Sequence, residues 1–455
     1  MRRLSRRSLL MGTTRSAVAL SLRAAITGLP LSFLLRGEAR ASDSNAKVTI
    51  LSCSSAGEAV NVCGPGTYEP GMEDVFNHPQ AGEVDGSEVG TVVVNGVGLT
   101  AEHLENGALV SLGEQVVTMA SAFEALPAEL LQHMVYFQHR TNAGIHPEFP
   151  AVLTGNGKLH NADGRGAEQL PSAIAQETAA LLGTTMQAPF VLGGGNFTSA
   201  GAPLPSYSPL QAKKLANSVG QTLGGPAKFG ALFDYYIDRT YAAVKANGTA
   251  EQKRFLDQHA SSRAQAAAFG ADLGQLLEDI VDNSYESELK AAVAIAKLKL
   301  APVVVTGFRF SGDNHSDFDL TIESAYTLRM IKALDSYWEA ATTLGVQDDI
   351  LYATSTVFGR DCRRKGGRGH DRGLCSGIVI GSHVKGGVVG GIDASSGTAM
   401  CTGFNSQTGE SADPDVLPDE TLSAYYRSLM MLAGVPEERR EVRLPVGRDV
   451  VSLIG

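Results

Sequence analysis

Short apolar runs and a helical repeat alternate in the second half of the chain. Residues 301–306 form a valine-rich run that breaks at Gly307, which is typical of a buried parallel strand. Four apolar residues then recur at intervals of three or four: Leu328, Ile331, Leu334 and Trp338. This spacing predicts a helix over about 322–344, and residues 350–354 predict the next strand. A strand, a crossover helix and a second strand indicate an α/β fold with a mostly parallel central sheet flanked by helices.

The first half of the chain predicts further strands at 47–52 and 134–138. A shorter strand is expected at 90–95, among loops rich in glycine, proline and valine. We expect a helix over 112–131. Residues from 205 to about 300 predict a helical segment that packs on the sheet or forms a cap.

Two capping boxes begin helices in that segment, Ser208 with Gln211 and Thr249 with Gln252. An apolar stripe supports the helical interpretation: Phe255, Leu256, Phe269, Leu273, Leu276, Leu277 and Ile280.

The first forty-one residues carry the pattern of an export signal. Residues 5–10 match the twin-arginine motif, 17–35 are moderately apolar, and 39–41 form a small-residue cleavage site. An uncleaved anchor is the alternative, but two arginines interrupt the apolar stretch. The pattern predicts recognition by the twin-arginine export machinery and a periplasmic or secreted mature chain. Residues 42–455 are expected to form one α/β domain, with a helical insertion at about 205–300 and no membrane span.

Charge narrows the possible partners. The whole chain has a formal net charge of −10. Removing residues 1–41 takes away eight arginines and one glutamate, which leaves 30 basic and 47 acidic residues and a net charge of −17. An acidic exported protein is a poor binder of nucleic acid, so that class of partner is excluded.

All five cysteines lie in the mature part: Cys53, Cys63, Cys362, Cys375 and Cys401. In an oxidising compartment, a bridge between Cys362 and Cys375 would close the loop around His370. Cys53 and Cys63 could close the first loop in the same way, although pairing cannot be read from sequence. A zinc site built from these thiols is less favoured, since no Cys-x-x-Cys spacing occurs.

Polar clusters follow three of the predicted strands. Asp313 and His315 come after the strand at 301–306, and a loop containing His370 and Asp371 follows the strand at 350–354. A third cluster, His139-Arg140-Thr141 with His146-Pro147, follows the strand at 134–138. Because open α/β sheets bind ligands at the carboxyl ends of their strands, these clusters indicate a site.

The residue types in these clusters are those of a metal site. Asp313, His315 and Asp371 could bind a divalent cation, with His370 or His383 completing the set. Imidazole and carboxylate ligands suit zinc, manganese or iron. The alternative is a set of hydrogen-bonded turns, since Asp and His are common in such loops.

Two arginines near these residues suggest an anionic ligand. The forked guanidinium groups of Arg360 and Arg372 could clamp an oxyanion such as phosphate or sulfate. A salt bridge to Asp313 or Asp371 is the alternative.

Several short motifs together resemble a bacterial exported family called domain of unknown function 1501. They are Asp313-x-His315, the stretch at 354–360, the Gly-x-Asp-x-Gly loop at 369–373 and the segment at 381–387. The segments at 139–141 and 54–68 look like the family's amino-terminal half. That family resembles the alkaline phosphatase and sulfatase superfamily, a parallel α/β sandwich with a metal site at the strand ends. The resemblance implies one or two divalent metal ions and metal-assisted hydrolysis of a small molecule that carries a phosphate or sulfate ester.

The chain departs from the family's pattern in three places, one of which is the stretch at 354–360, where the glutamate that the family carries just before Phe-Gly-Arg is missing. Arg372 stands where the family has a histidine ligand, and a guanidinium offers no lone pair to a metal. The superfamily also places an aspartate and a Ser or Thr nucleophile soon after the first strand. This chain offers Ser54 and Ser55 there but no aspartate, and a nucleophilic serine would need a metal or base beside it. The alternative function is therefore that of an inactive relative that binds a ligand or an envelope partner.

Overall fold

The computed structural model describes residues 45–160, 167–219, 272–310, 312–363 and 365–454, together with the single residues 239, 242, 246 and 249. Two compact units make up the chain: one comprises residues 41–208 and 283–455, and the other includes residues 209–282. The predicted signal segment and the apolar residues Phe255, Leu256 and Phe269 lie outside the described residues, as does Gln252 of the second capping box. Among the helices that the structure describes, none is long and apolar enough to cross a membrane.

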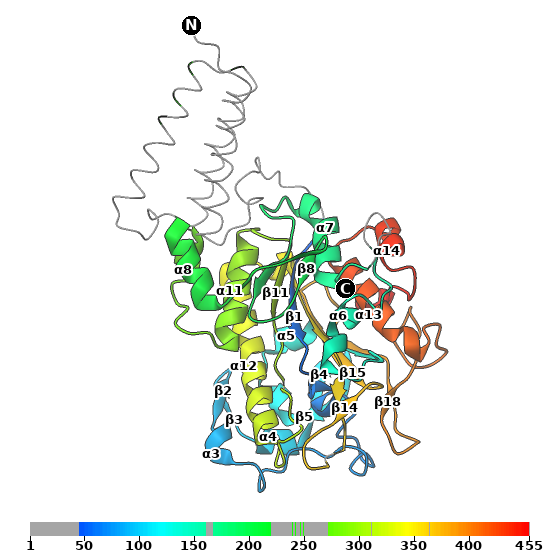
Figure 1. Cartoon of the computed structure of the whole chain (residues 1–455). Helices are drawn as coiled ribbons and strands as arrows, with labels where there is room; N and C mark the ends of the chain where they lie inside the picture. Colours follow the sequence, from blue (N-terminus) through cyan, green and yellow to red (C-terminus); the bar gives the residue numbers. More distant parts are fainter. Residues whose placement is uncertain are drawn as a thin grey trace. The chain divides into compact units, whose positions relative to one another are not determined.

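The larger unit is built on an eight-stranded sheet (Figure 1). Its strands lie in the order β10 (Ser206–Tyr207), β7 (Phe190–Leu192), β11 (Val303–Gly307), β1 (Val48–Ser54), β12 (Ile350–Thr356), β15 (Cys375–Ile380), β6 (Met134–His139) and β16 (Gly387–Val389). The first five are parallel, β15 is antiparallel to both of its neighbours, and β16 is parallel to β6. The predicted α/β class with a mostly parallel sheet is confirmed, and four predicted strands correspond to β1, β6, β11 and β12.

Helices cover both faces of this sheet. Figure 1 shows α11 (Tyr285–Lys297) and α12 (Thr321–Leu344) on one side, and α7 (Leu170–Leu182) and α13 (Thr421–Leu432) on the other. The predicted helix over 322–344 is confirmed as α12, which ends at Gly345 in the left-handed conformation. Because both faces are covered, all seven residues of β1 are buried.

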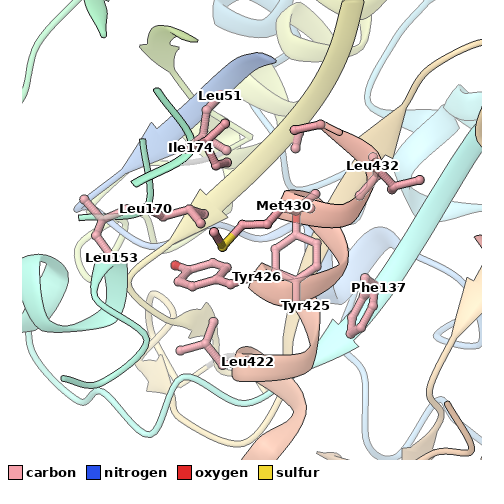
Figure 2. Close-up of a cluster of buried hydrophobic side chains, with 14 of the residues drawn as sticks. Leu51, Phe137, Leu153, Leu170, Ile174, Leu422, Tyr425, Tyr426, Met430 and Leu432 are labelled. Atoms are coloured by element: carbon pink, nitrogen blue, oxygen red, sulfur yellow. The ribbon is translucent and has the colours of Figure 1, made fainter. Parts of the chain in front are cut away.

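The core between the sheet and α13 is rich in aromatic side chains. Figure 2 shows Tyr425, Tyr426 and Met430 of α13 facing Leu51 of β1 and Ile174 of α7. The two tyrosine hydroxyls also bond to β12: Tyr425 donates to the Thr354 carbonyl at 2.7 Å, and Tyr426 lies 2.7 Å from the Ser355 hydroxyl. Burial of the rings and these bonds fix α13 against the sheet.

The helix predicted over 112–131 is wrong. Residues 107–120 form a hairpin of β4 (Gly107–Leu112) and β5 (Gln115–Ala120), followed by the short helices η2 (Ser121–Ala125) and α5 (Ala128–Gln132). Gly113, with a φ of 58°, makes the turn, and the adjacent Val116 and Val117 favour extended backbone. The strand expected at 90–95 is confirmed as β2 (Val92–Val94), which pairs with β3 (Val97–Leu99).

The remaining elements are short. The helices are α2 (Val60–Cys63), α3 (Gly86–Val89), α4 (Glu102–Glu105), η3 (His146–Glu148), α6 (Phe149–Leu153), α8 (Pro209–Val219), η4 (Gln347–Asp349), η5 (Pro418–Glu420), α14 (Glu437–Arg443) and η6 (Val451–Leu453). The small sheets pair β8 (Thr198–Ser199) with β9 (Ala202–Pro203), β13 (Gly359–Arg360) with β14 (His370–Asp371), and β17 (Ile392–Asp393) with β18 (Met400–Cys401). The helix start predicted at Ser208 is confirmed by α8.

All five cysteines are buried free thiols, so the expected Cys362–Cys375 and Cys53–Cys63 bridges are absent from these described residues. Cys375 lies inside the sheet, where its sulfur accepts a hydrogen bond from the Gly359 N–H at 3.1 Å. Cys362 instead packs in a separate small apolar cluster with Leu374. Burial raises the pKa of all five thiols, which keeps them protonated and unreactive at neutral pH.

Candidate metal centre

Four strands deliver their following loops to one edge of the sheet. β1 pairs in parallel with both β11 and β12, and β6 runs in the same direction because β15 is antiparallel to both β12 and β6. The carboxyl ends of β1, β6, β11 and β12 therefore lie at one edge, which is the usual position of a ligand site in an α/β sheet.

Four side chains from these loops form a group that could hold a metal ion. The group consists of His146, Asp313, His315 and His370, and one ligand atom from each lies within 4.8 Å of the others. The two Asp313 oxygens lie 3.4 Å from Nε2 of His146 and 3.5 Å from Nε2 of His315. Nε2 of His315 is 2.8 Å from Nε2 of His370. Ligand atoms that lie about 2.0–2.1 Å from a tetrahedral metal are about 3.3 Å from one another. The distances between neighbouring side-chain atoms of the group are close to this value.

Two of the imidazoles are fixed by the backbone with the same tautomer. His146 Nδ1 lies 2.7 Å from the Ser55 carbonyl, and His370 Nδ1 lies 2.6 Å from the Gly144 carbonyl. Since a carbonyl only accepts, each Nδ1 carries a proton, so the neutral form of each ring has its lone pair on Nε2. Metal-binding histidines in proteins are commonly oriented in this way.

Electrostatics also favour a neutral His370. Burial lowers the pKa of His370 below its usual value, and the positive charge of Arg360 adds to this effect, while the bond to Gly144 opposes it. A neutral imidazole is the form that binds a metal. The other three side chains of the group are open to solvent: Asp313 and His315 are about half exposed, and His146 is one-third exposed.

Phe358 lies beneath two of the histidines. Its ring stacks on His370 with centroids 3.9 Å apart, and the His146 ring meets it edge-on at 5.0 Å. These contacts restrict the rotation of both imidazoles.

Arg360 lies behind the group and has no exposed surface. Its Nη2 donates to the Gly312 carbonyl at 2.7 Å and to the Ala56 carbonyl, and it lies 3.5 Å from an Asp313 oxygen. A fully buried guanidinium cannot reach a bound substrate directly. Arg360 therefore takes the alternative role that the sequence left open, a salt bridge to Asp313. Arg360 therefore fixes the carboxylate.

Asp371, expected as a ligand, does not belong to the group. One of its oxygens accepts the N–H groups of Gly373 at 2.7 Å and Leu374 at 3.0 Å, which closes a turn. Burial raises the pKa of Asp371 to about 6. The alternative of a hydrogen-bonded turn therefore describes this residue.

His383 also lies apart from the group. It follows β15, whose antiparallel direction carries the chain to the opposite edge of the sheet. Its Nε2 lies 3.2 Å from the Leu432 carbonyl, and burial lowers the pKa of His383 to about 4. It is a neutral, packed histidine.

The two serines and Arg372 border the group. Ser54 is buried, and its hydroxyl oxygen accepts the Ala56 N–H at 3.1 Å in a small-residue turn. The Ser55 carbonyl accepts the hydrogen bond from His146, and the Ser55 side chain is exposed. Arg372 is exposed and lies against Gly144. It is so close that a Cβ added to that glycine would be 2.6 Å from the arginine Nε. Of the two arginines, only Arg372 is open to solvent beside the group.

The fourth member, His146, was grouped with a strand-end cluster in the sequence but not assigned as a ligand. The signal that could have identified it is its place after the strand at 134–138, at the same edge as Asp313.

No family model matches the chain, and no curated protein matches it. The resemblance to the family of unknown function and to the phosphatase and sulfatase superfamily therefore stays a prediction.

Proposed function

We propose that this protein is a metal-assisted hydrolase of phosphate or sulfate esters. One divalent transition metal of the zinc, manganese or iron class would be bound by His146, Asp313, His315 and His370, with a coordination position left open for water or substrate. The observation that carries the proposal is the convergence of three imidazoles and one carboxylate, with Nδ1 of two of the imidazoles fixed by a carbonyl.

A metal of this class, when bound, would supply a Lewis acid for an ester oxygen and would lower the pKa of a water molecule to about 7. The residues around it would then divide the remaining tasks. Arg360 holds Asp313 in place from behind, and exposed Arg372 offers donors to the charged group of the ester. Water is favoured over Ser54 as the nucleophile, because Ser54 is buried in its turn.

Family membership and export belong to the same proposal. The motifs at 313–315 and 369–373, the twin-arginine pattern and the net charge of the mature chain support an exported enzyme with an alkaline phosphatase-like or sulfatase-like fold. Such an enzyme would meet its ester substrate in the periplasm or outside the cell.

The number of ligands favours a second candidate function. Catalytic zinc usually has three protein ligands and an open position, whereas four protein ligands close a tetrahedral site. If all four side chains bind zinc at once, the metal would hold the loops together in a protein that binds a ligand or an envelope partner without turnover.

Hydrolysis assays distinguish the two candidates. The purified mature protein, reloaded separately with zinc and manganese, is assayed with para-nitrophenyl phosphate and para-nitrophenyl sulfate. The hydrolase proposal predicts turnover that is lost in His315→Ala and after chelation. Full metal occupancy without turnover of either ester would favour the second candidate, and turnover that survives chelation would contradict the metal-assisted mechanism.

A further inference from the structure

The two loops that carry most of the metal-binding group are in direct backbone contact. The Arg368 N–H donates to the Asn314 carbonyl at 3.2 Å. A Cβ added to Gly367 would collide with the carbonyl oxygens of Asn314 and His315. Asn314 lies between Asp313 and His315, and Arg368 comes two residues before His370. A shift of either loop therefore changes the distance between ligands.

A buried charge network joins the same two loops through their side chains. Arg368 Nε donates to both Glu323 oxygens, at 2.9 and 2.7 Å, and Asn314 Nδ2 donates to Glu323 at 2.6 Å. Arg368 has no exposed surface, Asn314 is 1% exposed and Glu323 is 3% exposed. Glu323 thus holds one residue from each loop on a single carboxylate.

The network is anchored on its other sides. Nη1 of Arg368 donates to the Asp361 and Cys362 carbonyls at 3.1 Å, and Nη2 donates to the Asn77 carbonyl at 2.6 Å. Glu323 lies in the first turn of α12, and its N–H is held at 2.8 Å by the Asp317 carboxylate. Both loops are therefore held by hydrogen bonds to a residue in the first turn of helix α12.

Neither Arg368 nor Glu323 belongs to the metal-binding group, and Asn314 is tied to Glu323 through its Nδ2. Arginine has no lone pair for a metal, and the Glu323 oxygens already accept three hydrogen bonds. A carboxylate enclosed in this way supports ligands instead of binding metal itself.

We infer that Asn314, Glu323 and Arg368 are positioning residues that set the affinity and coordination geometry of the metal site. This inference rests on the proposed metal-binding function. Outer residues that orient ligands typically change metal affinity by about 10–100-fold when they are substituted.

The test compares two amide-to-alanine truncations in the purified mature protein. Asn314→Ala removes the amide from the network beside the site. Gln176→Ala removes an amide from a partly buried arginine–carboxylate network, in which Arg443 donates to Gln176 at 2.8 Å and to Glu177 at 2.7 Å. Metal affinity is measured by competition with a chelator, and coordination geometry by the visible spectrum of the cobalt-loaded protein.

We expect Asn314→Ala to weaken metal binding by about 10–100-fold and to alter the cobalt spectrum, while Gln176→Ala changes neither. Gly367→Ala provides a second variant, which should shift the spectrum because the loops must move apart. Wild-type affinity and an unchanged spectrum in Asn314→Ala would overturn the inference and leave the proposed function standing. A wild-type protein that binds no metal would overturn both.

Discussion

Replacing His146 by alanine tests the member of the group that the sequence did not assign as a ligand. In the metal-free protein, the substitution removes the hydrogen bond from His146 to the Ser55 carbonyl. Such a bond contributes about 1 kcal/mol to the free energy of unfolding. Metal binding should suffer more, because even residues that only orient ligands change affinity by about 10–100-fold. We expect the loss of a ligand to weaken binding by about 100-fold or more.

Because zinc binding to the folded protein raises its free energy of unfolding, weaker binding appears as a measurable loss of stability. Free zinc at about 100 times the Kd stabilises a folded protein by about 2.7 kcal/mol. At the same free zinc, a variant with about 100-fold weaker binding retains only about 0.4 kcal/mol of that stabilisation. The zinc-dependent part of the free energy of unfolding should therefore nearly disappear.

Urea unfolding of both proteins, in buffered zinc and in chelator, measures the two effects separately. His160→Ala is the control, since His160 is another partly exposed histidine that does not belong to the group. It should keep the full zinc-dependent stabilisation. A His146→Ala protein that keeps more than about 2 kcal/mol of it would refute His146 as a ligand.

Three further predictions concern the other residues that the sequence singled out. Burial lowers the pKa of His383 to about 4 from an ordinary value of about 6.5, so the unfolded chain binds the extra proton first as pH falls. Between pH 6.5 and 5, His383→Gln, which still offers a donor to the Leu432 carbonyl, should lose about 1.6 kcal/mol less of its free energy of unfolding than wild type does in urea titrations; an unchanged pH profile would contradict a neutral His383. In denatured, non-reduced protein all five cysteines should react with a thiol reagent, and a mass shift for fewer would reveal a bridge. Ser54→Ala should change ester turnover by less than about tenfold, whereas a loss of about 1,000-fold would identify Ser54 as the nucleophile.

Much of the fold could be predicted from local sequence pattern. The buried strands and α12 have a single strong periodicity, and their burial on the sheet reinforces it. The hairpin at 107–120 was missed, because its turn depends on the left-handed conformation of Gly113, and the apolar residues around that turn fit a helical period equally well.

The site could be predicted only in part, for reasons of strand direction and side-chain alternation. His370 and Asp371 are consecutive on β14, and consecutive strand residues face opposite sides, so the side that faces the group takes only one of them. His383 was assigned to the wrong edge, since the antiparallel direction of β15 is not encoded in its own residues. His146 reaches the group through a turn in which Asn142 has a φ of 56°, a path that residue types alone do not indicate.

Metal content shows whether the group at this edge of the sheet binds a metal ion. The mature protein is purified without chelator, offered zinc, manganese and iron, desalted, and assayed by elemental analysis beside a variant that carries both Asp313→Ala and His315→Ala. We predict about one equivalent of transition metal in the wild type and little in the variant, because the substitutions remove two of four ligands. Less than about a tenth of an equivalent in the wild type, or equal occupancy in both proteins, would contradict a metal centre at this edge of the sheet.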